Sequence, residues 1–554
     1  MKSAKIVPFI FLFILFSLTL LEVPAMENEA ADVSWFRSFV DEDPESAYNY
    51  AASISRISLN TSLSHYSFRV GGSPGEYFVY RYIESLLNKW NISTHTEEFS
   101  FINWDIFGEP NITIMWGNSN ETYRIYPEHY TFGTPIEGLK ANICHLPLPK
   151  HYSRNPLPED IAIRWNKTNV NGKIVLIGRE VLFNENWAIQ FLNKILIEKP
   201  SGILYSWATE EYKEYPFFHS STGGRRIQVY KDYMLPVAWV EKSLTNKLIQ
   251  ELESNKSIIG VLKIPINENE GVVRNIIATI PGIDTSKEIL VTAHYDSVMA
   301  SGLSDNGAGV AGVLEIAWAF SKAYREGIFK PHVNITFVFF TSEEAGLVGS
   351  AKYVELHKAK IDNIIAVINL DSIGSLEMSV SVDEIGILAP STKECIYLHD
   401  LINSIAESME IKTSVFSDMI HSDDSTFANP SVVKSLIENW WGIEVDIGDV
   451  SQRPAVMICS APLFPWERED YRGWIHTPYD NVTSTEIYDW VNPSRLETHI
   501  KVAGLTILKL LELFKEESRE EQRQNTWLTF GVLTAVCGSM LIIVLVKKRL
   551  SIGK

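Results

Sequence analysis

The part of the chain after Val272 alternates between short apolar runs and a helical pattern, and this alternation limits the fold more than any other feature. Apolar runs cover Ile289–Ala293, Ile335–Thr341 and Ile364–Leu370, and a helical pattern covers Gly309–Glu326. A strand, helix, strand order places parallel strands side by side beneath helices. The sequence therefore predicts an α/β fold with a mainly parallel sheet and helices on both faces.

Composition narrows the range of functions that the chain can have. The chain has 554 residues, of which 45% are hydrophobic and 21% charged, so more than one domain is expected and disorder is excluded. With 49 basic and 68 acidic side chains the net charge is −19, which makes nucleic acid an unsuitable partner. The cysteines show no CxxC spacing, so His and carboxylate groups must hold any metal. At most one disulfide is expected, and its expected partners are Cys395 and Cys459.

The two ends of the chain predict export and a membrane anchor. Residues 1–25 have the layout of a secretory signal peptide, a charged start before an apolar run, and a retained N-terminal anchor is the alternative. Residues 526–546 are uncharged and would span roughly 31 Å as a helix. Because Lys547, Lys548 and Arg549 follow, residues 547–554 are expected in the cytoplasm. This predicts a single-pass cell-membrane protein whose lipid partner is the bilayer and whose main part lies outside.

The rest of the chain divides into segments that differ in their predicted secondary structure. Residues 47–90 show mainly helical spacing, and residues 269–517 carry the strand and helix alternation. The segments 45–120 and 269–517 are expected to form one domain. Between them, residues 121–268 show short strand-like runs such as Lys173–Gly178 and Pro236–Val240, separated by polar loops. The middle segment is therefore predicted to be an inserted β-rich module.

Two glycine motifs are rejected as functional sites. Gly307–Gly312 matches the dinucleotide fingerprint GxGxxG, but about a dozen residues separate it from the preceding strand, whereas the fingerprint follows its strand directly. Gly71–Gly75 matches GxSxG, but Pro74 follows the serine and lacks the N–H that an oxyanion hole requires. The second motif is better explained as a turn that leads into a helix.

The chemistry is predicted where the strands end. Ligands of an open parallel sheet bind outside the carboxyl ends of its strands. Histidine and acidic side chains follow those strand ends or lie in the loops beside them. They are His294, Asp296, Asp305, Glu343, Glu344, Asp371 and His476. So many adjacent acids would repel each other unless cations neutralised them.

Nitrogen and oxygen ligands with open positions suit a pair of catalytic zinc ions that share a bridging carboxylate. A carboxylate that is not a ligand is also needed, as a general base. Because Glu343 and Glu344 are adjacent, one can bind metal while the other faces the attacking water, and spacing alone leaves open which does so. Asp296, two residues from His294, is placed to accept the second N–H of its imidazole.

These residues resemble the M28 family of co-catalytic zinc peptidases in five ordered blocks: Ala293–Ser297, Ser304–Gly309, Thr341–Gly346, Asn369–Asp371 and His476–Pro478. The resemblance implies two Zn²⁺ per chain, one bound by His294 and Asp371 and the other by Glu344 and His476. It implies that Asp305 bridges them, that Glu343 is the general base and that Asp296 orients His294. A cis bond between Asp305 and Asn306 is also implied.

The same resemblance extends to fold and activity. It implies a zinc-peptidase (phosphorylase/hydrolase-like) domain, with Arg69–Glu76 similar to the family's N-terminal segment, and a protease-associated (PA) domain at residues 121–268. The expected activity is that of an aminopeptidase acting on peptides. Carboxypeptidase action, a catalytically silent receptor-like homologue and an acyl-transfer cyclase are the alternatives. A homodimer is suggested by analogy only.

Two departures from the family pattern bear on selectivity. The family often carries Ser-Asp-His before a Phe, whereas this chain has Ser422-Asp423-Asp424 before Phe427. Between Asn429 and Pro454, a stretch with Trp440 and Trp441 finds no counterpart. It is expected to form either a lid over the site or an ordinary packed loop.

Overall fold

The computed structural model describes residues 34–42, 46–61, 68–117, 119–150, 155–182, 184–207, 235–254, 256–375, 384–416, 422–460, 475–483 and 490–516. The predicted signal peptide, the predicted span and the predicted tail lie outside these residues.

The first sheet has eight strands in the order β1-β10-β12-β11-β13-β16-β14-β15. Four neighbours in its centre run parallel: β12 (Val333–Phe340), β11 (Asp284–His294), β13 (Ile364–Leu370) and β16 (Ala455–Ser460). The parallel centre is confirmed, since the apolar runs predicted as strands form β11, β12 and β13. The sheet is mixed at both ends.

Antiparallel pairing occurs on both sides of that centre. On one side, β10 (Ile266–Ile280) pairs with β12 and, along its whole length, with β1 (Ser93–Ile106). On the other, β14 (Glu384–Leu388) pairs antiparallel with β16 and parallel with β15 (Lys412–Phe416). These neighbours are far apart in sequence, so the alternation of strand and helix does not indicate them.

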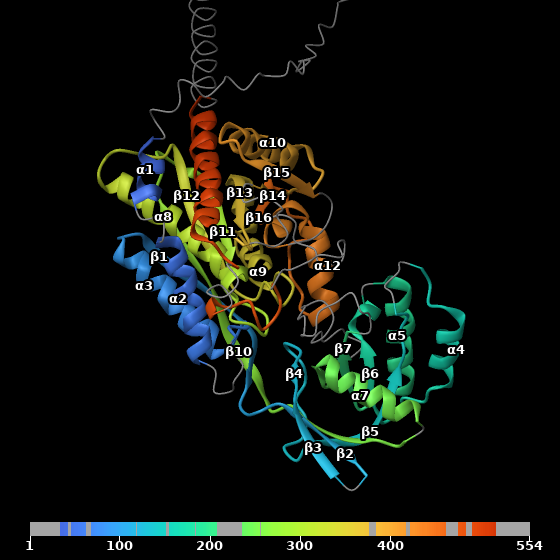
Figure 1. The fold of residues 1–554 in the computed structure, drawn as a ribbon. Coiled ribbons are helices and arrows are strands. Elements are labelled where there is room, and N and C mark those ends of the chain that lie inside the picture. The colour runs from blue at the N-terminus through green and yellow to red at the C-terminus, as the bar shows by residue number, and fades with distance from the viewer. Residues whose placement is uncertain are drawn as a thin grey trace, which may run out of the picture.

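Helices lie on both sides of the sheet (Figure 1). On one side are α2 (Ser46–Thr61), α3 (Pro74–Lys89) and α8 (Gly309–Arg325), with α1 (Ser34–Glu42) packed on α8. On the other are α10 (Lys393–Ser408) and α12 (Pro430–Trp441), while α9 (Val348–Leu356) and α11 (Asp424–Ala428) contact each other and α12. A further helix covers residues 493–516.

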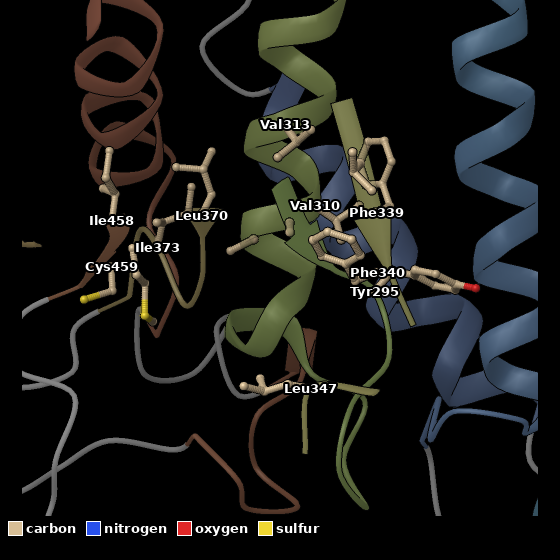
Figure 2. Close-up of a cluster of buried hydrophobic side chains, with 14 of the residues drawn as sticks. Tyr295, Val310, Val313, Phe339, Phe340, Leu347, Leu370, Ile373, Ile458 and Cys459 are labelled. Carbon is tan, nitrogen blue, oxygen red and sulfur yellow. The ribbon is translucent and has the colours of Figure 1, made fainter. Parts of the chain in front are cut away.

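The core of this domain joins the sheet to α8. Phe339 and Phe340 of β12, Leu370 of β13 and Val310 and Val313 of α8 are all fully buried (Figure 2). The same cluster reaches Ile458 and Cys459 on β16, so one continuous apolar interior fixes where the strands end.

The glycine motifs have structural roles. Ser73 caps α3, because its hydroxyl accepts the N–H of Glu76 at 3.3 Å. Gly309 begins α8 so close to β13 that an added Cβ would lie 2.2 Å from the carbonyl oxygen of Leu370. The interpretation of Gly71–Gly75 as a turn before a helix is therefore confirmed.

A second sheet of eight strands lies between β1 and β10 in sequence, in the order β3-β2-β9-β5-β6-β7-β8-β4. Its strands are β2 (Asn111–Trp116), β3 (Ser119–Arg124), β4 (Tyr126–Pro127), β5 (Leu139–Leu146), β6 (Ile174–Gly178), β7 (Gly202–Ser206), β8 (Val237–Trp239) and β9 (Ile259–Lys263). Its helices are α4 (Glu159–Lys167), α5 (Glu185–Glu198) and α7 (Lys242–Glu253). The sheet begins upstream of the predicted boundary at residue 121. Its identity as a PA domain stays a prediction.

Two predictions are corrected. Within the described ranges, no helix is both long and apolar enough to cross a bilayer. The helix over residues 493–516 is long but carries Lys501, Lys509 and Glu512. The predicted fold class is therefore wrong in including a C-terminal transmembrane helix. The predicted disulfide is also wrong, because the buried Cys395 and Cys459 form no disulfide with each other, and Cys395 lies against the backbone of Arg453 and Ala455.

Candidate metal centre

The three predicted strand ends meet at one edge of the first sheet. His294 is the last residue of β11, Asp371 follows β13, and Glu343 and Glu344 follow β12. Since β11 lies between β12 and β13 and pairs parallel with both, their carboxyl ends are neighbours. Asp305 comes from the segment between β11 and α8, and His476 comes from a distant part of the chain.

Five of these side chains form two groups that share one carboxylate. The first group is His294, Asp305 and Asp371, and the second is Asp305, Glu344 and His476. Within each group the potential ligand atoms lie within 4.8 Å of one another. The structure thus brings together all the residues that the sequence predicted as metal ligands.

Asp305 presents one carboxylate oxygen to each imidazole. Its Oδ1 lies 3.1 Å from Nε2 of His294, and its Oδ2 lies 2.8 Å from Nε2 of His476. Asp371 Oδ1 is 3.5 Å from His294 Nε2, and Glu344 Oε1 is 3.6 Å from His476 Nε2. This is the arrangement expected of a carboxylate between two metal positions.

Glu343 belongs to neither group but lies beside the first. Its Oε2 is 3.9 Å from His294 Nε2, and its side chain is 11% exposed, against 3% for Glu344. The structure therefore separates the two adjacent glutamates: Glu344 belongs to the group with Asp305 and His476, whereas Glu343 lies beside His294 and is the more exposed of the two.

The backbone around Asp305 is held by residues that the sequence did not single out. Asp480 accepts the N–H groups of Ser304 and Asp305 at 2.8 and 3.0 Å, and its carboxylate also accepts the indole N–H of Trp490 at 2.8 Å. The bond between Asp305 and Asn306 is cis, as the resemblance implies. Asp480 lies just beyond the predicted block His476–Pro478, and the sequence did not indicate its function.

Asn306 ties this segment to β13. Its side-chain amide donates to the carbonyl of Leu370 at 2.8 Å and accepts the N–H groups of Gly309 and Ser372 at 2.8 and 3.2 Å. Because Leu370 directly precedes Asp371, these bonds set the spacing between Asp305 and Asp371.

Asp296 has a second contact besides the one predicted. Its Oδ1 lies 3.4 Å from Nδ1 of His294, in a geometry that is not a hydrogen bond. Its two oxygens instead accept the backbone N–H groups of Glu343 and Glu344 at 3.0 and 3.3 Å. Asp296 therefore holds the loop that carries both glutamates as well as lying beside His294.

The carbonyl groups of this loop receive donors from elsewhere. His129 donates from Nε2 to the carbonyl of Glu344 at 3.1 Å, and Trp441 donates from its indole N–H to the carbonyl of Ala345 at 2.6 Å. No sequence motif pointed to His129. Trp441 lies in the stretch that could not be aligned with the family, and it packs against the site loop.

Burial and mutual charge shift the titration of the acids. Burial raises the pKa of Glu343 and of Glu344 well above the ordinary value, and neighbouring carboxylates add to the shift. Burial also acts to raise the pKa of Asp305, but the hydrogen bonds with His294 and His476 outweigh it and hold that pKa well below its usual range. A site of this kind favours bound cations, because they stabilise the ionised carboxylates.

Arg69 is the buried cation beside this cluster. Its Nε donates to the carbonyl of Tyr295 at 2.7 Å, and a terminal guanidinium nitrogen donates to the carbonyl of Ser301. Burial lowers the pKa of Arg69 to about 10, against the opposing charges of Asp480 and Asp305. Arg69 therefore stays charged at neutral pH, and its positive charge offsets part of the negative charge of the neighbouring carboxylates.

The family departure at Asp423 and Asp424 places two more carboxylates in the interior. Both are fully buried, and burial raises the pKa of Asp423 to about 7 and that of Asp424 well above its ordinary value. Ser422, which precedes Asp423, accepts the side-chain N–H of Asn369 at 2.9 Å, so this segment lies beside the strand end that carries Asp371. The site therefore contains more carboxyl groups than the predicted metal ligands alone.

Comparison with known proteins supports the predicted family. Residues 275–492 match peptidase family M28. The predicted resemblance to this family is thus confirmed for this segment, and the match supports the predicted enzyme class, a metallopeptidase. The M28 segment contains all seven predicted site residues, but neither Arg69 nor His129.

Curated relatives agree with this match. The chain is 26% identical over 348 residues to the probable lipoprotein aminopeptidase LpqL of Mycobacterium tuberculosis, covering 60% of this chain and 62% of that protein. It is 32% identical over 215 residues to leucine aminopeptidase 2 of Trichophyton equinum, covering 37% of this chain and 38% of that protein. The alignments thus span less than two thirds of either relative.

Solved structures share the fold. The zinc aminopeptidase BSAP of Bacillus subtilis superposes with a TM-score of 0.56 at 18% identity, over 84% of this chain and 95% of that one. An aminopeptidase from Aneurinibacillus sp. strain AM-1 gives 0.54 at 20% identity, over 86% and 95%. The shared fold extends well beyond the M28 segment.

Proposed function

We propose that this protein is a zinc-dependent aminopeptidase that removes N-terminal residues from peptides. One observation carries the proposal: Asp305 joins two groups of possible metal ligands while Glu343, a partly exposed carboxylate beside them, belongs to neither. A shared carboxylate and a free one are what a two-metal peptidase needs.

The donor set fits zinc. Each group combines one imidazole nitrogen with two carboxylates, and Zn²⁺ takes such ligands while keeping a position open for catalysis. His294 and Asp371 would hold one ion, Glu344 and His476 the other, and Asp305 would bridge them. Two ions bound there would supply Lewis-acid chemistry to the scissile carbonyl.

Glu343 would move the proton. As a general base it takes a proton from the attacking water and, as the acid formed in that step, delivers it to the leaving amine. Burial raises the pKa of Glu343 and the charge of Glu344 adds to the shift, and a raised pKa suits a side chain that accepts a proton and later returns it. Asp296 keeps this glutamate in place through the backbone N–H that it accepts.

The charges around the site favour an aminopeptidase over a carboxypeptidase, which would need a cation for the substrate carboxylate. Arg453 donates to the carbonyl of Ile364 at 2.9 Å and pairs with Asp362, and Arg274 pairs with Glu98 and lies over Tyr80. Both arginines are thus engaged elsewhere, and Arg225 and Arg226 lie outside the described residues. The acidic surroundings of the metal centre suit a substrate ammonium group instead.

Two further observations support the proposal. The matched relatives are named as aminopeptidases. All five positions of the predicted ligand set and Glu343 are filled by residues able to perform their roles, which disfavours the catalytically silent receptor-like alternative. The N-terminal apolar run also leads us to propose that the enzyme acts outside the cytoplasm.

The test is hydrolysis by the purified protein of three probes: leucine p-nitroanilide, its N-acetyl derivative, and an N-blocked dipeptide with a free carboxyl group. We expect cleavage of the first alone, loss of activity with a zinc chelator and recovery when Zn²⁺ is restored. Full activity in excess chelator would refute the zinc mechanism. Cleavage of the blocked dipeptide alone would replace the aminopeptidase by a carboxypeptidase.

A further inference from the structure

The second sheet reaches the metal centre through the turn Glu128–Thr131, which follows β4. Within its own sheet this turn is held by β8: the N–H of Glu128 donates to the carbonyl of Val237 at 3.1 Å, and the hydroxyl of Thr131 accepts the N–H of Val237 at 2.8 Å. The indole of Trp239 donates to the carboxylate of Glu128 at 2.6 Å. Because these bonds involve both the first and the last residue of the turn, they fix its position on the sheet.

The same turn is bonded to the first domain at three points. The indole of Trp104 donates to the carbonyl of Thr131 at 3.0 Å, and the hydroxyl of Tyr130 donates to the carbonyl of Gly71 at 2.9 Å. His129, which is 1% exposed, makes the third contact, to the carbonyl of Glu344 at 3.1 Å. Figure 1 shows β4 on the side of the second sheet that faces the first domain.

The bond from His129 completes a set of contacts around the glutamate loop. A carbonyl oxygen can only accept, so Nε2 of His129 carries the proton. Asp296 accepts the N–H of Glu344, which belongs to the peptide group before its Cα, and His129 donates to the C=O of Glu344, which belongs to the peptide group after it. Trp441, whose ring meets that of Tyr130 edge-on at 5.2 Å, donates to the next carbonyl.

We propose that His129 is a positioning residue of the metal centre, holding the peptide group of Glu344 so that its carboxylate faces His476 and that of Glu343 faces the substrate. The inference rests on the proposed function. It means that the second sheet completes the active site, and that the M28 segment, which lacks His129, is not a complete catalytic unit.

The physical reason is the burial of the carbonyl. Without a donor from His129, the oxygen of Glu344 would be left in the interior without this hydrogen bond, which costs about 1–3 kcal/mol. The loop can recover part of that cost by rotating the peptide unit, and such a rotation would displace both glutamate side chains. Residues that orient metal ligands typically change metal affinity or activity by about 10–100-fold when they are replaced.

The experiment compares two substitutions that differ in their donor. His129→Gln places an amide N–H at about the reach of Nε2, whereas His129→Leu has similar bulk and no donor. His145→Leu is the matched control, since His145 is a half-buried histidine on β5 of the same sheet. For each protein we would measure zinc affinity by chelator competition, kcat and KM for leucine p-nitroanilide, and the melting temperature.

We expect His129→Leu to weaken zinc binding or lower kcat by about tenfold or more with KM changed less than threefold. His129→Gln should stay within about threefold of the wild type in both quantities, and the control should be unchanged. A folded His129→Leu protein with wild-type zinc affinity and kcat would overturn the proposal, as would equal losses in the Gln and Leu proteins.

If His129→Leu does not fold, His129→Asn takes its place, because its amide is too short to reach the carbonyl. Absence of zinc binding and peptidase activity in the wild type would refute the proposed function. A zinc-binding, active wild type with no difference among the variants would refute only the role of His129.

Discussion

Nε2 of His476 lies 2.8 Å from Oδ2 of Asp305, although 170 residues separate them in the sequence. The other oxygen of the same carboxylate faces His294, so Asp305 belongs to both groups of possible ligands while Asp371 belongs to one. Replacing the shared residue should therefore affect metal binding more widely than replacing a residue of one group.

Metal content tests this relationship. We expect Asp305→Ala to lose most bound zinc at both positions and Asp371→Ala to lose about one equivalent, relative to two in the wild type. Elemental analysis of the purified proteins measures the content, and Asp446→Ala, a surface change, serves as the control because its carboxylate is 73% exposed. Equal zinc content in the Asp305→Ala and wild-type proteins would contradict the bridging role.

The two adjacent glutamates should separate in their effects. Glu343→Gln is expected to lower kcat by about 10²–10⁴-fold while zinc content stays at the wild-type level, because a general base contributes about that factor. Glu344→Gln should instead lower zinc affinity, since its carboxylate faces His476. Parallel zinc titrations and single-turnover rates distinguish the two. The assignment fails if Glu343→Gln loses its zinc and Glu344→Gln keeps it.

Glu76 predicts a pH dependence of stability. Tyr295 has one hydroxyl proton, yet its oxygen lies 2.5 Å from the carboxylate of Glu76 and 2.7 Å from the carbonyl of Arg274. A protonated Glu76 satisfies both contacts by donating to the tyrosine. This agrees with the pKa of Glu76, which burial raises to about 7 from 4.5.

The sign follows from linkage. Because the folded pKa is raised, the folded protein binds the extra proton, and the stabilisation is fully present below pH 4.5 and lost as pH rises through about 7. The loss is on the order of 3 kcal/mol. Glu76→Gln is neutral at every pH, so its free energy of unfolding should rise relative to the wild type between pH 5 and 8. Glu270→Gln, at an exposed position of β10, should show no such trend.

Gly309 tests the rejected dinucleotide motif. A Cβ added there would lie 2.1 Å from the side-chain oxygen of Asn306, so Gly309→Ala should displace Asn306 and cost about 1–3 kcal/mol of unfolding free energy, with weaker zinc binding. Gly448→Ala is the control, since Gly448 is exposed and the nearest atoms belong to the flexible side chain of Lys434. Urea denaturation measures both. A neutral Gly309→Ala change would show that this close approach is not required.

Much of the fold and the site was open to prediction because apolar strands and the polar residues that end them are local signals. Strands β11, β12 and β13 each appear as one apolar run, and parallel pairing brings His294, Glu344 and Asp371 to one edge. The contact of His129 was not predictable, since it joins a single histidine to a backbone carbonyl, and a carbonyl acceptor leaves no mark on the sequence. The antiparallel neighbours β10 and β14 were missed because their partners are distant in the chain.

The full-length pairing of β1 with β10 has a consequence for how the chain is connected. The pairing runs in antiparallel register from Ser93 opposite Thr279 to Ile106 opposite Ile266. Residues 107–265 therefore connect the two strands of a β-hairpin. All strands of the second sheet lie within this connection. Lengthening such a loop from a tight turn to this size costs only about 3 kcal/mol of closure entropy. A chain could thus gain or lose the whole second sheet without rethreading the first, and the loss would reach the metal centre through the missing bond from His129.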